Sequence, residues 1–239
     1  MSGPFVLEVE AVVAGYRPEV DIVQGISFDL APGQLIAIVG PNGAGKSTLI
    51  KCLCGILHAR AGRIVLNGND DVTGARPHQI VRRGVGYVAQ RDNVFPRLTV
   101  EENLEVGVFR GDDDPGARRE ETLALFPALA RRRRQPAGIL SGGERQMLAI
   151  ARTLIRKPTV LLLDEPSAGV DPKTLVVLWD KIKEIHALGV ATVLVEQNAR
   201  QALALADAGY VLDGGRIRFS GSGNDLLADP RVAELYLGG

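Results

Sequence analysis

The sequence predicts an α/β domain with a parallel β-sheet at its centre and a helical segment inserted into it. Three apolar runs, Leu35–Val39, Val160–Leu163 and Val190–Val195, have the composition of strands that are buried on both faces of a sheet. Helical stretches lie between these runs, as parallel strands require. A charged stretch with few β-branched residues, from about residue 91 to residue 139, interrupts the pattern and predicts the inserted helices. Domains of this class bind ligands at the carboxyl ends of their strands.

Alternating patterns predict further strands around the first buried run. Val6–Val13 and Ile26–Leu30 alternate, and Arg63–Leu66 leads into an Asn-Gly turn. We expect a helix from about Lys46 to Leu53 that ends at Gly55, because glycine suits the position after a helix.

The C-terminal half carries clear helix and turn signals. Asp171-Pro172 supplies an N-cap and a first helical residue for a helix that runs to Gly189. Tyr210–Leu212 and Arg216–Phe219 flank an Asp-Gly-Gly turn and predict a hairpin. The last stretch, Asp225–Leu237, is expected to be helical.

The composition is that of a globular chain without a charge bias. Of 239 residues, 46% are hydrophobic and 23% are charged, and Lys+Arg and Asp+Glu both number 28. Neither a nucleic-acid partner nor an anionic membrane is indicated, and the short run Arg131–Arg134 cannot make a basic face. Cys52 and Cys54 point to different faces of a helix, so we expect them to be unpaired and buried. Without a signal-peptide pattern or a membrane-spanning run, we expect a cytosolic protein that reaches a membrane only through a partner.

A glycine-rich loop follows the first buried strand and opens the next helix. It has the pattern G-x-x-x-x-G-K-[ST] and consists of Gly40, Pro41, Asn42, Gly43, Ala44, Gly45, Lys46, Ser47 and Thr48. Its backbone N–H groups can surround phosphates at the positive end of a helix. Lys46 would reach the β- and γ-phosphates, and the Ser47 hydroxyl would bind Mg²⁺. The strand before the loop and the helix after it argue against a chance glycine-rich turn.

Two acidic residues follow the buried run Val160–Leu163. Asp164 would hold the metal, directly or through water, and Glu165 would polarise the attacking water as a general base. Many strands end in acidic residues, so the pair alone is weak evidence for a catalytic site. The glycine-rich loop about 120 residues upstream makes this evidence strong.

A second phosphate-binding helix is predicted at Leu140–Gln146. Ser141 and Glu144 have the spacing of a capping box, and Gly142 and Gly143 leave the first N–H groups of the helix bare. These groups could bind phosphate. Because the first loop already holds one nucleotide, the second site makes sense if it closes on the γ-phosphate held by another subunit. The alternative is an ordinary capped helix.

Leu140–Gln146 resembles the signature motif of the ABC ATPases, and the order of motifs along nearly the whole chain is similar to that family. The resemblance implies one domain over residues 5–238, with a P-loop NTPase core of the ABC ATPase type, an antiparallel β subdomain and a helical subdomain at about residues 91–157. It implies ATP and Mg²⁺ as cofactors. It also implies that two cassettes, identical or different, pair head to tail, so that Ser141, Gly142 and Gly143 contact the nucleotide of the partner cassette.

The resemblance assigns roles to three further residues. Tyr16 would stack on adenine, although a lone loop tyrosine is unremarkable by itself. Gln90 would contact Mg²⁺ and the attacking water, where the alternative is a surface glutamine. Asp171 would lie at the dimer interface, within the segment Ala168–Asp171, and could also be the helix N-cap.

One position departs from the family. ABC ATPases usually carry a histidine after the strand equivalent to Val190–Val195, but Gln197 stands there, and none of the three histidines can replace it. Gln197 can donate a hydrogen bond to the γ-phosphate, although it cannot carry a proton or a positive charge. We expect it to act with Lys46 and Glu165 in catalysis.

Three segments, at residues 95–104, 194–199 and 226–231, resemble the LivF-type cassettes of branched-chain amino-acid uptake. The expected function is therefore ATP hydrolysis that powers uptake of such amino acids, at the inner face of the cell membrane. Permease subunits and a solute-binding protein would be the partners. The subgroup commonly has Pro-Glu-Gly where this chain has residues 89–91, and often lacks Asp171, so a urea or amide importer and a lipid exporter stay open.

Two other classes of function are disfavoured. Soluble ABC ATPases of DNA repair, chromosome handling or translation usually have coiled-coil insertions or two cassettes in one chain, and the neutral charge balance argues against nucleic acid. A regulatory module without catalysis would not need both Asp164 and Glu165.

Overall fold

The computed structural model describes residues 5–91, 93–108 and 114–236, which form two sheets and the helices around them. The strands are β1 (Leu7–Ala14), β2 (Val23–Leu30), β3 (Leu35–Val39), β4 (Ala61–Leu66), β5 (Asp70–Asp71), β6 (Val85–Val88), β7 (Val160–Asp164), β8 (Ala191–Glu196), β9 (Ala208–Asp213) and β10 (Arg216–Gly221). The helices are α1 (Lys46–Leu53), α2 (Pro77–Arg82), α3 (Val100–Gly107), α4 (Pro115–Leu125), α5 (Pro127–Ala130), the 3₁₀ turn η1 (Ala137–Ile139), α6 (Gly142–Leu154), α7 (Pro172–Ala187), α8 (Ala199–Leu205), α9 (Gly223–Ala228) and α10 (Pro230–Tyr236).

The central sheet has the strand order β10-β9-β3-β8-β7-β6. Its neighbouring strands are parallel except for the antiparallel pair β9–β10. Every residue of β3, β7 and β8 is buried, which confirms the prediction of strands covered on both faces. Along β3, Leu35, Ala37 and Val39 belong to one apolar cluster and Ile36 and Ile38 to the other, so the sheet separates two cores.

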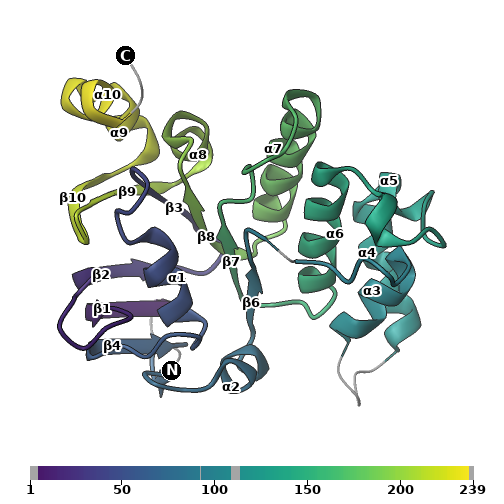
Figure 1. The fold of residues 1–239 in the computed structure, drawn as a ribbon, viewed down its shortest axis with the longest axis horizontal. Coiled ribbons are helices and arrows are strands. Elements are labelled where there is room, and N and C mark those ends of the chain that lie inside the picture. Colours follow the sequence, from purple (N-terminus) through teal and green to yellow (C-terminus); the bar gives the residue numbers. More distant parts are fainter. Residues whose placement is uncertain (1–4, 92, 109–113, 237–239) are drawn as a thin grey trace.

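The second sheet is antiparallel, with the order β2-β1-β4-β5, and lies at the lower left of Figure 1, below β9 and β10. Helix α1 contacts β1 on one side and β7 and β8 on the other, so it packs between the two sheets. The Asn67-Gly68 turn has φ angles of 51° and 75°, in the left-handed region that asparagine and glycine adopt most readily.

Helices α3, α4, α5 and α6 pack together on the right of Figure 1, on the far side of the central sheet from the antiparallel sheet. The predicted helical stretch begins later than expected, because the described residues before Val100 form a loop. Thr99 caps α3: its hydroxyl oxygen accepts a hydrogen bond from the N–H of Glu102 at 3.1 Å, and the Glu102 carboxylate accepts one from the N–H of Thr99 at 2.7 Å.

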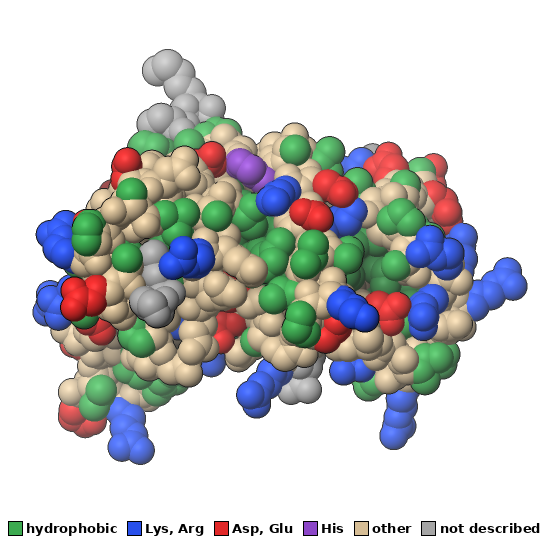
Figure 2. Space-filling model, turned by 90° about the horizontal axis from the view of Figure 1, so that it is seen from above, with side chains coloured by type: hydrophobic (Ala, Val, Ile, Leu, Met, Phe, Trp, Pro, Cys, Tyr) green, Lys and Arg blue, Asp and Glu red, His purple; other side chains and the backbone are tan. Residues whose placement is uncertain are grey.

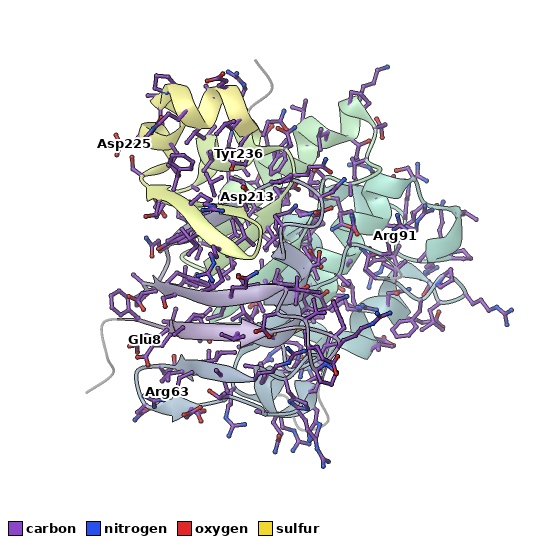
Figure 3. All side chains as sticks on the ribbon, turned by 60° about the vertical axis from the view of Figure 1, so that its left-hand side comes forward. Glu8, Arg63, Arg91, Asp213, Asp225 and Tyr236 are labelled. Atoms are coloured by element: carbon purple, nitrogen blue, oxygen red, sulfur yellow. The ribbon has the colours of Figure 1, made fainter. Side chains whose placement is uncertain are left out.

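The C-terminal stretch contains two short helices, α9 and α10, separated at Asp229. Pro230 has no N–H and disfavours a helical conformation of the residue before it, which explains the break. The predicted ends of this stretch and of the domain, residues 237 and 238, lie outside the described residues. Tyr236 donates a hydrogen bond to Asp213 at 3.1 Å, and both residues lie close together in Figure 3.

Two short helices, α2 and α8, were not predicted. Across the described ranges of the chain, none of the helices is both long enough and apolar enough to cross a bilayer. Figure 2 shows hydrophobic side chains gathered in a hollow near the middle of the face seen from above, with charged side chains around it.

Candidate functional site

A cavity of about 700 Å³ lies beside the loop that joins β3 to α1. Gly45 is the N-cap of α1, has a φ of 106°, and offers no side chain to the first N–H groups of the helix. Those groups therefore stay available for an anion. The cavity is lined by Ile22, Asn42, Gly43, Gly45, Lys46, Ser47, Thr48, Gln90, Arg91, Glu165, Ala168, Gly169 and Gln197.

Lys46 is held inside the loop. Its side chain is buried, and Nζ donates hydrogen bonds to the carbonyl oxygens of Gly40 at 2.8 Å and Pro41 at 3.0 Å. Nζ also lies 3.3 Å from Oε1 of Glu165. The loop thus fixes a cation beside the acidic end of β7.

Asp164 and Ser47 form a pair of oxygen ligands. The Ser47 hydroxyl donates to Oδ1 of Asp164 at 3.2 Å, and the Tyr87 hydroxyl donates to Oδ2 at 3.4 Å. Burial raises the pKa of Asp164, while the hydrogen bond from Ser47 lowers it. A carboxylate and a hydroxyl are ligands that Mg²⁺ prefers, and a bound cation would favour the ionised carboxylate.

The described part of the chain contains no group of three or more His, Cys, Asp or Glu side chains that could hold a metal ion. A magnesium ion at Asp164, Ser47 and Gln90 would therefore take its other ligands from phosphate and water. Mg²⁺ is commonly bound in this way in nucleotide sites, so the residues fit the ion.

Glu165 lies between Lys46 and Gln90. Nε2 of Gln90 donates to Oε2 of Glu165 at 2.7 Å, and the N–H of Glu165 donates to the carbonyl of Val195 in the neighbouring strand at 2.9 Å. Its backbone has a φ of 46°, in the left-handed region that side chains with a Cβ disfavour. Glu165 is thus a residue with a strained backbone that is fixed by contacts with Lys46, Gln90 and Val195, and its side chain lines the cavity.

Gln197 follows β8 and lines the cavity, whereas His58, His78 and His186 do not. The structure thus places Lys46, Ser47, Gln90, Glu165 and Gln197 around one cavity, with Asp164 bonded to Ser47 at its buried side.

Besides Asp164, the predicted residues that do not line this cavity are Tyr16, Gly40, Pro41, Ala44, Ser141, Gly142, Gly143 and Asp171. Ser141 forms the expected capping box: its hydroxyl accepts from the N–H of Glu144 at 3.2 Å, and the Glu144 carboxylate accepts from the N–H of Ser141 at 2.9 Å. Asp171 caps α7 by accepting from the N–H of Thr174 at 3.1 Å. Tyr16 is 56% exposed and accepts a hydrogen bond from Nζ of Lys51 at 3.1 Å.

The two glycines of α6 have different surroundings. Gly142 is exposed, whereas Gly143 is buried where α6 meets the start of α7. A Cβ on Gly143 would lie 2.1 Å from Cγ2 of Thr174 and 3.2 Å from Cγ1 of Val170. Close packing between α6 and α7, which depends on the fold and cannot be read from the motif, therefore requires glycine at this position.

Sequence reasoning also missed Arg91, whose position beside Gln90 was the only available signal. Arg91 is exposed and lines the phosphate cavity. Figure 3 shows it on the side of the molecule away from Glu8 and Arg63 of the antiparallel sheet. It adds a second positive charge to Lys46 at the cavity.

Residues 23–168 match the family model described as ABC transporter. The chain belongs to the ABC transporter family. It is an ATP-binding cassette of that family and an ATPase, and the antiparallel sheet and helices around its core are consistent with the ABC ATPase fold.

Curated relatives and solved structures are similar over almost the whole cassette. It is 44% identical to the high-affinity branched-chain amino acid transport ATP-binding protein BraG of Pseudomonas aeruginosa, over 95% of this chain and 97% of that protein. It is 41% identical to the probable branched-chain amino acid transport ATP-binding protein LivF of Archaeoglobus fulgidus, over 94% and 95%. A solved ATP-binding cassette of an ABC transporter in its ADP conformation has a TM-score of 0.86 and 29% identity, over 98% and 99%. The predicted resemblance to branched-chain amino-acid cassettes is thus confirmed.

Proposed function

We propose that this cassette hydrolyses ATP to power a membrane transporter that takes up branched-chain or other small amino acids. The observation that carries the proposal is the arrangement of Lys46, Glu165, Gln90 and Gln197 around one cavity at the start of α1. The substrate class follows from the two relatives, both of which are named for branched-chain amino acid transport.

In this proposal each side chain of the cavity has one task. The N–H groups at the start of α1 and the Lys46 ammonium hold the phosphates of ATP. Asp164, Ser47 and Gln90 hold Mg²⁺, which neutralises charge on the phosphates when it is bound. Glu165 takes the proton of the attacking water, and Gln197 donates a hydrogen bond to the γ-phosphate.

A second cassette would complete the site. Ser141, Gly142 and Gly143 lie outside the cavity of their own chain, so they would contact the nucleotide of a partner. Gly142 and Ser141 are exposed and free to do this, and Gly143 keeps α6 against α7. Asp171 would lie at the same interface, and Tyr16 would stack on the adenine. The partner cassette is either a second copy of this chain or a related chain.

ATP would join the two cassettes and hydrolysis would let them part, and the helical segment would transmit this motion to permease subunits. The permease subunits would hold the cassette at the inner face of the membrane. A cavity of about 530 Å³ lies between β6, α2, α3 and α6. Its lining includes Phe95 and Val106 as well as Arg82, Arg118, Arg152 and Arg156. Positive charge beside apolar side chains suits an acidic amphipathic helix of a permease. A solute-binding protein would deliver the amino acid from outside.

Glu165→Gln tests the catalytic part of the proposal. The variant should bind ATP, turn it over at less than about a hundredth of the parental rate, and form a stable dimer with ATP and Mg²⁺ in size-exclusion chromatography. Glu234→Gln, at an exposed site on α10, is the matched control and should behave like the parent. Normal hydrolysis by Glu165→Gln would refute the assignment of the base.

Reconstitution tests the transport part. The cassette, its permeases and a binding protein would be placed in vesicles, and ATP turnover would be measured with leucine, with urea and without solute. Stimulation by leucine is expected. Turnover that urea stimulates and leucine does not would refute the substrate class. Arg82→Glu should weaken co-purification with the permeases.

A further inference from the structure

A buried carboxylate next to the phosphate cavity has no role in the steps proposed above. Glu196 is the last residue of β8 and is 1% exposed. Oε1 accepts a hydrogen bond from the N–H of Ser167 at 2.9 Å. Oε2 accepts from the Ser167 hydroxyl at 2.8 Å and from the N–H of Gln197 at 3.2 Å. These neutral donors are its only hydrogen-bond partners among residues 5–91, 93–108 and 114–236, and the nearby Glu165 carboxylate carries like charge.

The donors belong to two different loops of the site. Ser167 follows Glu165 by two residues, and the next residues, Ala168 and Gly169, line the phosphate cavity. Gln197 lines the same cavity from the end of β8. One carboxylate therefore joins the loop after β7 to the loop after β8, and with them the proposed base to the proposed γ-phosphate donor.

The strained backbone of Glu165 requires contacts that fix the loop after β7. Its φ of 46° is a left-handed conformation, which is unfavourable for a residue with a Cβ. A strained residue keeps its conformation only where its surroundings fix it. The hydrogen bond from its own N–H to Val195 is one restraint, and the bonds that Glu196 accepts from Ser167 are the next along the chain.

A role in stability alone would favour a different residue. An ionised carboxylate that is buried without a cation destabilises the folded chain, and burial correspondingly raises the pKa of Glu196. An apolar side chain at the end of a buried strand would avoid this cost. The carboxylate is useful where several donors converge and must be held in one arrangement.

We propose that Glu196 is a positioning residue for ATP hydrolysis: its carboxylate holds Ser167 and Gln197 so that Glu165 and the Gln197 side chain face the γ-phosphate together. This inference rests on the proposed function. Glu196 does not line the cavity, so it should affect turnover more than ATP binding.

Glu196→Gln is the first test, in an ATPase assay of the full chain with ATP and Mg²⁺. The amide has the same size as the carboxylate, and its oxygen can still accept a hydrogen bond. Its NH₂ group, however, replaces the second oxygen and cannot accept the hydrogen bond that this oxygen receives in the parent. The turnover number kcat should fall about tenfold or more, whereas the KM for ATP should stay within about twofold of the parental value.

Ser167 provides a second, milder test. Ser167→Ala removes one donor and should lower kcat, and Ser167→Thr, which keeps the hydroxyl, should restore it. The double variant Glu196→Gln, Ser167→Ala should lose less than the product of the two single losses, because both changes break the same contact. If Glu196→Gln does not fold, the Ser167 variants decide alone.

Thr192→Val is the matched control on the same strand. Thr192 is also 1% exposed, and its hydroxyl donates to the carbonyl of Val190 at 3.0 Å, away from the cavity. The variant should lower the melting temperature and leave kcat unchanged. An equal fall in kcat for Thr192→Val and Glu196→Gln would overturn the proposal, as would a parental kcat for Glu196→Gln. The proposal would also fail if the loss of kcat in the double variant equalled the product of the losses in Glu196→Gln and Ser167→Ala. A parent without hydrolysis, or an active Glu165→Gln, would instead overturn the proposed function.

Discussion

The contact between Gly143 and α7 makes a quantitative prediction about stability. A Cβ at Gly143 would lie 2.1 Å from Cγ2 of Thr174, whereas carbon atoms in contact are about 3.5–4.0 Å apart. Thr174 is β-branched and sits on a helix, so its side chain has few other rotamers. The starts of α6 and α7 must therefore separate by about 1.5 Å in Gly143→Ala. Overpacking of this kind costs about 2 kcal/mol, which lowers the melting temperature of a chain of this length by about 4–8 °C.

Thermal unfolding of the nucleotide-free chain, followed by circular dichroism, checks this value. Gly142→Ala is the matched control, because the one described atom that its Cβ would approach within 4 Å is the carbonyl oxygen of Gly169, at 3.3 Å. Its melting temperature should change by no more than about 2 °C. Thr174→Ser removes the methyl group in the contact and should restore part of the stability of Gly143→Ala. The packing argument fails if the two alanine variants are equally stable, or if Thr174→Ser restores nothing.

Further predictions concern the cavity and the buried polar groups. Gln197→Ala should lower kcat at least about tenfold, because it removes a donor to the γ-phosphate; hydrolysis at the parental rate would exclude that role. Arg91→Ala should raise the Kd for ATP about fivefold in a titration at low salt, which corresponds to ~1 kcal/mol of binding free energy. The increase in Kd should be smaller at high salt, because salt screens the guanidinium charge. An unchanged Kd would mean that the guanidinium does not reach the phosphates. Burial raises the pKa of Asp164, so the parent loses stability as the pH rises through that pKa. Asp164→Asn should therefore raise the melting temperature of the nucleotide-free chain, and the gain should grow with pH. A gain in melting temperature that is the same at every pH would contradict this. Burial raises the pKa of Cys52 to about 12 and that of Cys54 to about 11, so neither should react with a thiol reagent at pH 8 before unfolding, and rapid labelling of the folded chain would refute the burial.

Local patterns were the part of the fold that could be predicted. The runs that became β3, β7 and β8 are apolar except for Thr192, and a strand covered on both faces readily accommodates such a run of four to six residues. The Ser141 cap and the start of α7 at Pro172 depend on residues at most three positions apart, so the sequence contains their whole geometry.

Contacts between distant segments could not be predicted. Ser167 and Glu196 are 29 residues apart, and only the pairing of β7 with β8 brings them together. The close approach at Gly143 depends in the same way on how α6 packs against α7. Helix α8 is short, and its N-cap Asn198 lies only two residues after the end of β8, so no run of helical periodicity could reveal it.

The position of Ser141 outside the cavity of its own chain has a kinetic consequence under the proposed pairing. A single chain then carries two halves of different sites and no complete one. ATP consumption per chain should rise with chain concentration until most chains are paired, as expected for a rate limited by a bimolecular step. Chains that have not yet joined a permease would be dilute and would consume little ATP. Gathering two cassettes on one membrane partner would raise their effective concentration and so confine hydrolysis to assembled transporters.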